Sequence, residues 1–152
     1  MARIVRRIPV DRDPVEVFDA IADFSTTARW DPGVRSSMAL DDPPVGPGAR
    51  FEVTLDQGPF GPRLTYETRT YDRPRRVVLH TRNALVEGTD DISVEADGDG
   101  CVVIWEADFA LRGPVGRLVD PVLARGFGKV GDAAVSGLGE WLRAGGSARH
   151  AA

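Results

Sequence analysis

The chain has 152 residues, which suits one domain with a substantial core and leaves little room for a second. Hydrophobic residues make up 42% of it and charged residues 28%, the usual proportions of a soluble globular protein. The formal net charge of −4 argues against a nucleic-acid partner, because phosphate contacts need a concentrated basic surface. No apolar run approaches the ~20 residues of a membrane span, so membrane insertion is not expected.

The N-terminal segment and the single cysteine bear on the cellular location. Arginines interrupt the apolar residues of segment 1–10, which therefore lacks the continuous apolar stretch of a secretory signal. Cys101 has no second cysteine to pair with, and it lies among strand-forming residues where a buried, inert thiol is expected. These features predict a cytoplasmic protein.

The first elements in chain order are a strand and a short helix. Hydrophobic residues alternate along segment 3–10, as in a strand with one buried face. Asp13, Pro14 and Glu16 then form a helix-start signature, with Asp13 as the N-cap and a proline in the first helical position. The sequence therefore predicts a helix that begins directly after Asp13.

A second, shorter helix is expected between Ser25, as its cap, and Trp30. It should end there because a proline and a glycine follow at positions 32 and 33. Two helices of this length are too small to bury a tryptophan by themselves. We therefore predict that Trp30 is buried where these helices meet a sheet or the last helix.

Turn-forming residues divide the region 34–111 into a series of strands. Clusters of proline, glycine, aspartate and asparagine mark the breaks. The strands are expected near residues 35–41, 49–57, 63–72, 75–82, 87–96 and 101–111. With the first strand they make seven, and the short connections predict antiparallel hairpins.

Alternation within two of these strands indicates which face points to the core. Phe51, Val53 and Leu55 alternate with polar residues in one strand, and Trp105 and Phe109 lie on a single face of the last strand. These bulky side chains predict an apolar inner face.

The C-terminal part predicts one long helix from residue 114 to residue 143, with a continuous apolar stripe. Pro121 is expected to kink this helix or to split off its first turn. Six glycines fall within it, and we interpret them as places where the helix approaches the sheet closely. The alternative, a helix that shifts to admit a ligand, stays open.

The order and spacing of several short motifs resemble the START-like (SRPBCC) superfamily, and within it the polyketide cyclase/dehydrase branch. The motifs are Asp13-Pro-Val-Glu-Val-Phe18, Ala22-Asp-Phe24 leading to Trp30-Asp-Pro-Gly-Val34, Trp105-Glu-Ala-Asp-Phe109, and Leu111-Arg-Gly-Pro-Val-Gly-Arg-Leu118.

The resemblance implies an α+β helix-grip fold. In that fold a curved, seven-stranded antiparallel sheet wraps around the long C-terminal helix, with two short helices after strand one and an apolar cavity inside. We expect one such domain over residues 1–144 and a frayed tail over residues 145–152.

Residues suited to catalysis are few. The only histidines are His80 and His150, so a multi-histidine metal site is excluded, and neither a metal nor a cofactor is expected. His80 and Tyr66 are the weak catalytic candidates. His80 shares a strand face with Arg82 and should point outward, whereas Tyr66 shares one with Leu64 and can point inward.

One further acidic pair offers little for catalysis. Asp90 and Asp91 are consecutive in a strand, so their carboxylates should point to opposite faces and not share a substrate. The inner face is therefore expected to carry abundant apolar surface and no clear acid–base pair.

The resemblance makes a cavity that binds a hydrophobic small molecule, such as a lipid or polyketide, the preferred interpretation. The residues expected to line this cavity are Trp30, Phe51, Val53, Leu55, Tyr66, Trp105, Phe109, Leu123 and Phe127. Two alternatives stay open: a polyketide cyclase or dehydratase acting in the same cavity, and a partner-binding module resembling a co-chaperone. Whether the chain is an enzyme is left undecided, because fold membership does not determine activity.

Overall fold

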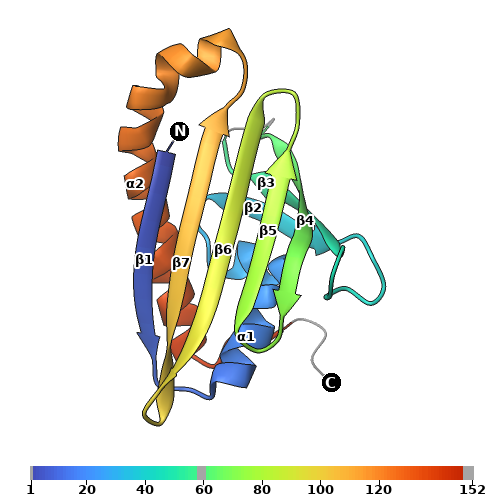
Figure 1. Cartoon of the computed structure of the whole chain (residues 1–152), viewed down its shortest axis with the longest axis vertical. Helices are drawn as coiled ribbons and strands as arrows, with labels where there is room; N and C mark the ends of the chain where they lie inside the picture. The colour runs from blue at the N-terminus through green and yellow to red at the C-terminus, as the bar shows by residue number, and fades with distance from the viewer. Residues whose placement is uncertain (1, 58–60, 149–152) are drawn as a thin grey trace.

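A single antiparallel sheet curls around one long helix, as Figure 1 shows. The computed structural model describes residues 2–57 and 61–148, except for the side chains of residues 115, 117 and 119–125. Its elements in chain order are β1 (Ala2–Val10), α1 (Pro14–Ala22), the 3₁₀-helix η1 (Phe24–Arg29), β2 (Val34–Ala39), β3 (Arg50–Leu55), β4 (Arg63–Asp72), β5 (Arg76–Arg82), β6 (Val86–Asp97), β7 (Gly100–Leu111) and α2 (Pro114–Arg143).

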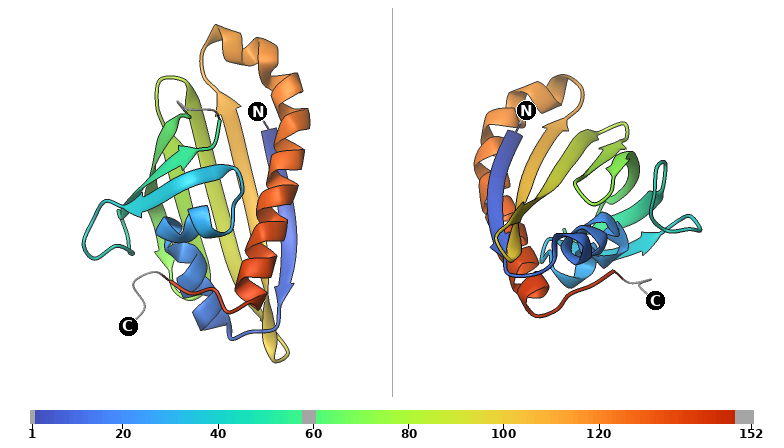
Figure 2. Two further views of the ribbon diagram at one scale, coloured as in Figure 1. Left: turned by 180° about the vertical axis from the view of Figure 1, so that it is seen from behind. Right: turned by 60° about the horizontal axis from the view of Figure 1, so that its bottom comes forward.

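The strand order across the sheet is β1-β7-β6-β5-β4-β3-β2. Consecutive strands from β2 to β7 pair as antiparallel hairpins, and β1 returns to pair with β7. Figure 2 shows α2 running along β1 and β7, with α1 and η1 near the end of the sheet that the C-terminal turns of α2 reach. This arrangement confirms the predicted helix-grip fold and its seven strands.

The core lies between the inner face of the sheet and the helices. In β3, Phe51 and Val53 are buried as the alternation predicted, and in β7 the same holds for Val103, Trp105 and Ala107. The bounds of the predicted strands differ from the observed ones by at most two residues at either end. Hydrophobic alternation was therefore sufficient to identify the buried face.

Two capping aspartates begin the short helices. The carboxylate of Asp13 accepts a hydrogen bond from the amide N–H of Glu16 at 3.3 Å, which confirms the predicted N-cap of α1. The cap of η1 is Asp23 and not Ser25, because the Asp23 carboxylate accepts from the Ser25 amide at 3.1 Å. The prediction was wrong because α1 ends directly at Asp23, which serves both helices without an intervening loop.

Helix α2 continues from Pro114 to Arg143, and Figure 1 shows its first turns bent away from the axis of the remainder. Pro121 therefore does not end the helix. At the C-terminal end of α2, the Arg12 guanidinium donates hydrogen bonds to the carbonyls of Leu142 and Gly146, both at 2.8 Å. The first residues of the expected tail are thus held against the end of the helix, whereas residues 149–152 lie outside the described part of the chain.

Gly137 marks the closest approach of α2 to the Trp30 segment. A Cβ atom there would lie 1.9 Å from the Trp30 carbonyl oxygen, whereas a Cβ at Gly126 would meet nothing within 4 Å. We expect Gly137→Ala to lower the free energy of unfolding by about 1 to 3 kcal/mol, since the backbone must move. Gly126→Ala, the control, should be neutral or stabilising by up to about 1 kcal/mol. Urea unfolding of both variants checks this, and equal effects would show that Gly137 is not a packing constraint.

Candidate functional site

An internal cavity of about 340 Å³ lies between the inner face of the sheet and α2. The predicted residues that line it come from five places in the fold: Trp30 after η1, Val53 and Leu55 in β3, Tyr66 in β4, Trp105 and Phe109 in β7, and Phe127 in α2. The rings of Phe109 and Phe127 stack with centroids 5.7 Å apart, so sheet and helix meet at this point.

Among the predicted lining residues whose side chains are described, only Phe51 does not face the cavity. Phe51 is fully buried in the core, where its ring lies 6.3 Å from that of Phe24, and it does not line the cavity. The Leu123 side chain lies outside the described residues. Several lining residues were not predicted, among them Ile4, Phe24, Leu64, Ala107, Asp31 and Asp90.

Trp30 forms part of the cavity wall and is buried, with 4% of its surface exposed. Its ring meets that of Trp105 edge to face, with centroids 5.5 Å apart. The indole N–H of Trp30 donates to the Thr26 hydroxyl at 3.3 Å, so the polar end of the ring is satisfied inside the protein. The predicted burial of Trp30 is confirmed.

Asp90 places a carboxylate in this apolar wall. It is 9% exposed, and it accepts a hydrogen bond from the indole N–H of Trp105 at 2.8 Å. Burial raises the pKa of Asp90 to about 6, against the lowering effect of the Trp105 bond, and the charges of Asp31 and Asp108 raise it further. Asp91 points to the outer face and pairs with Arg76 at 2.7 Å, so the two aspartates do lie on opposite faces as expected.

Asp31 and Tyr66 are the other ionisable groups of the lining. Burial raises the pKa of Asp31, while the bond from the Gly33 amide, at 2.8 Å, lowers it. The pKa of Tyr66 lies well above its ordinary value because of burial and the nearby charges of Asp90 and Asp31. The sequence analysis expected no clear acid–base pair on the inner face and did not predict that Asp90 lines the cavity. It used alternation to place Asp90 and Asp91 on opposite faces, but it did not determine which of the two points inward.

His80 lies on the outer face of the sheet and does not line the cavity. Its Nδ1 is 3.0 Å from the Thr89 hydroxyl, and its Nε2 is 3.5 Å from Glu87. Both partners come from the neighbouring strand β6. The structure thus separates the two catalytic candidates, with Tyr66 at the cavity and His80 outside it.

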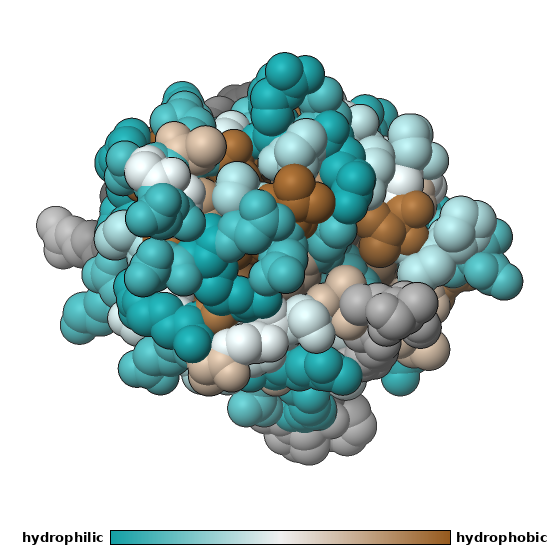
Figure 3. Space-filling model, turned by 90° about the horizontal axis from the view of Figure 1, so that it is seen from below, coloured by the Kyte–Doolittle hydropathy of each residue, from teal (hydrophilic) through white to brown (hydrophobic). Residues whose placement is uncertain are grey.

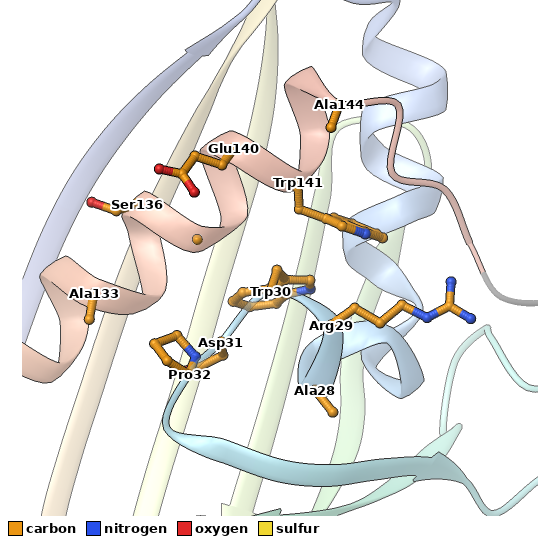
Figure 4. Close-up of a pocket in the computed structure, with 11 residues that line it drawn as sticks. Ala28, Arg29, Trp30, Asp31, Pro32, Ala133, Ser136, Glu140, Trp141 and Ala144 are labelled. Atoms are coloured by element: carbon orange, nitrogen blue, oxygen red, sulfur yellow. The ribbon is translucent and has the colours of Figure 1, made fainter.

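A second, open hollow of about 610 Å³ runs along the outside of the molecule between the η1–β2 connection and the C-terminal half of α2. Figure 4 shows Trp30, Asp31 and Pro32 on one side of it and Ala133, Ser136 and Glu140 on the helix opposite. We call it the outer groove. Trp30 and Asp31 line both the outer groove and the cavity, so they form the partition between them.

The end of the molecule that carries α1 presents a different surface. In Figure 3 hydrophilic residues cover most of this face, and hydrophobic residues appear only singly among them. Among the described residues no group of three histidine, cysteine, aspartate or glutamate side chains could hold a metal ion. None of the described helices is long and apolar enough to cross a membrane.

A sequence profile of one family matches residues 1–142, nearly the whole chain. That family is described as "Polyketide cyclase / dehydrase and lipid transport". The chain belongs to this family. No curated protein matches it with significance.

Several solved structures have the same fold as this member of the polyketide cyclase/dehydrase family. It is similar to the protein TTHA0849 from Thermus thermophilus, with a TM-score of 0.75 and 18% identity over 96% of this chain and 99% of the other. A START superfamily protein from Mycobacterium smegmatis gives a TM-score of 0.74 and 11% identity, covering 92% and 96% of the two chains. These similarities establish the START-like fold.

An enzyme with this fold is also among the similar structures. A norcoclaurine synthase point mutant from Thalictrum flavum, in complex with a transition state analogue, matches with a TM-score of 0.64 and 17% identity. The match covers 93% of this chain and 95% of that one. The fold is therefore compatible with catalysis, although identity at this level carries no residue roles.

Proposed function

We propose that the protein binds a hydrophobic small molecule in the cavity between the sheet and α2. The supporting observation is the cavity itself, because its volume of about 340 Å³ lies within the roughly 300 to 1,000 Å³ of small-molecule sites. A wall of aromatic and aliphatic side chains with few polar groups is the usual composition of such a site. Family membership supports the same function, since its description includes lipid transport.

The apolar wall should determine the affinity for a neutral probe. Phe127 lies at the part of α2 that lines the cavity and stacks on Phe109, so Phe127→Ala removes apolar contact without emptying the core. Truncating a buried aromatic contact is worth about 1.5 kcal/mol or more, which corresponds to roughly tenfold in affinity. We expect 2-naphthalenemethanol, measured by isothermal titration calorimetry, to bind Phe127→Ala about tenfold more weakly than the wild type.

His80→Ala is the control for this experiment, because His80 lies on the outer face. It should leave the affinity for 2-naphthalenemethanol unchanged. Equal weakening by both substitutions, or wild-type binding in Phe127→Ala, would contradict binding in the cavity.

A second candidate function, an acid–base enzyme acting on a polyketide-like chain, is favoured by one observation. Asp90 and Tyr66 bring a carboxylate and a phenol to the same cavity. In an aldol closure a base removes a proton from the carbon next to one carbonyl, that carbon bonds to a second carbonyl carbon, and the oxygen of the second carbonyl takes up a proton. Asp90 can serve as the base and Tyr66 as the proton donor.

Turnover of a poly-β-keto analogue tests this second candidate. If the protein is such an enzyme, Asp90→Asn and Tyr66→Phe should each lower kcat by ~100-fold or more while the analogue still binds. Binding of the analogue without any turnover by the wild type would leave the binding function and eliminate the enzyme.

A further inference from the structure

The charged side chains described on the cavity wall are all of one sign. Among its lining residues whose side chains are described, Asp31 and Asp90 are the only charged ones, and none is arginine, lysine or histidine. The other polar side chains there, such as Thr27, Gln57 and Tyr66, are neutral. A cavity that binds fatty acids or other anions would be expected to present a cationic side chain to the ligand.

Asp31 and Asp90 both line the cavity. Asp90 belongs to β6 in the sheet, whereas Asp31 lies in the connection between η1 and β2. The charge of Asp31 raises the pKa of Asp90, and both charges raise that of Tyr66. A charged ligand group in this cavity would interact electrostatically with both carboxylates.

Each carboxylate keeps unused capacity to accept hydrogen bonds. Asp90 has one described donor, the Trp105 indole, and Asp31 has one, the Gly33 amide. A carboxylate offers about four acceptor positions. A buried carboxylate such as Asp90 is costly without a compensating cation, so a ligand that brings positive charge and N–H donors would relieve a cost already present in the protein alone.

The apolar surroundings decide what kind of cation fits. Calcium needs six to eight oxygen ligands and magnesium about six, which two carboxylates in an aromatic wall do not supply. The rings of Trp30, Trp105 and Tyr66 line the same cavity, and aromatic faces attract organic ammonium groups. The remaining apolar volume would hold the hydrocarbon part of the same molecule.

We propose that the cavity selects hydrophobic molecules carrying a protonated amine, with Asp90 and Asp31 as the partners of the ammonium group. This inference rests on the proposed binding function and specifies its ligand class. An anionic ligand would add a negative charge beside Asp31 and Asp90, so we expect it to bind more weakly than a neutral one.

Matched probes that differ only in one group test the proposal. We would titrate the wild type at pH 7.5 with 2-naphthylmethylamine, 2-naphthalenemethanol and 2-naphthoate, and repeat the series with octylamine, octanol and octanoate. A charge-assisted hydrogen bond in a buried site is worth roughly tenfold or more in affinity. The amine of each series should therefore bind at least ~10-fold more tightly than the alcohol, and the carboxylate more weakly than the alcohol.

Asp90→Asn separates the role of this carboxylate from general electrostatics. It should lower the ratio of amine to alcohol affinity ~10-fold or more, since only the amine uses the charge. Asp91→Asn is the matched control: it removes the same charge from the neighbouring residue, which points to the outer face and pairs with Arg76. Asp91→Asn should leave both affinities unchanged.

The outcomes distinguish this inference from the function on which it rests. Alcohol binding without preference for the amine, or equal losses in Asp90→Asn and Asp91→Asn, would overturn amine selection and leave the proposed function intact. If no probe of either series binds, the binding function fails and the inference fails with it.

Discussion

Replacing Trp30 by alanine should lower the free energy of unfolding by about 3 to 5 kcal/mol, the usual cost of truncating a buried aromatic residue. Trp30 is 4% exposed, packs edge to face on Trp105 and hydrogen-bonds to Thr26. Its loss also removes a side chain that lines both the cavity and the outer groove. Urea unfolding monitored by far-UV circular dichroism measures the change.

Trp141→Ala is the matched control for that experiment, because Trp141 is only partly buried and packs at the edge of the core. The same substitution there should cost clearly less. A loss below about 1 kcal/mol for Trp30→Ala, or a larger loss for Trp141→Ala, would contradict the central position assigned to Trp30.

Asp90→Asn should make the protein more stable at pH 7.5, by up to about 3 kcal/mol. The pKa of Asp90 is raised from 3.8 to about 6, so the fold favours the protonated carboxyl, and each unit of difference is worth about 1.4 kcal/mol. Asparagine keeps an oxygen that can accept from Trp105 while it removes the buried charge. If Asp90 binds the ligand as proposed, this variant gains stability and loses affinity for amines.

The stability gained in Asp90→Asn should depend on pH, and the raised pKa of Asp90 determines the direction of that dependence. A carboxyl whose pKa is higher in the folded than in the unfolded protein contributes full stability below about pH 4 and loses it as the pH rises through about 6. The stability of Asp90→Asn relative to wild type should therefore be smallest near pH 4 and increase up to pH 7. Trp105 donates a hydrogen bond to Asp90; Tyr66 and Asp31 line the cavity with it, and the charge of Asp108 acts on it from the other face of β7.

Urea unfolding at pH 4, 5, 6 and 7.5 supplies these differences. Asp91→Asn is again the control, because Asp91 is paired with Arg76 on the outer face, and it should show no increase of stability with pH. A constant difference between Asp90→Asn and the wild type across this range would show that the Asp90 carboxyl is not perturbed in the fold.

The fold could be predicted from local patterns because each pattern reports a single physical constraint. The alternation of Phe51 and Val53 with polar residues reports one buried face, and the turn clusters report where hairpins reverse. Asp13 could be identified as a cap because its partner, Glu16, lies three residues away. The cap of η1 was assigned incorrectly because two helices share Asp23 without a loop between them.

The polar part of the site was harder to predict, because it depends on contacts between distant segments. Asp90 lies on the inner face with Ile92 and Val94, and period-two alternation along β6 could have identified it. Asp31 offers no such signal, since its place in the wall results from how the η1–β2 connection packs against α2. Phe51 was expected in the wall because alternation tells inside from outside but does not separate core from cavity.

Intermolecular nuclear Overhauser effects would test most directly where a ligand binds. With isotope-labelled protein and 2-naphthylmethylamine, we expect contacts from the naphthyl protons to Val53, Ala107 and Phe127, which line the cavity and not the outer groove. Contacts to Ala133, Ser136 and Ala144 alone would place the ligand in the outer groove and contradict the internal site.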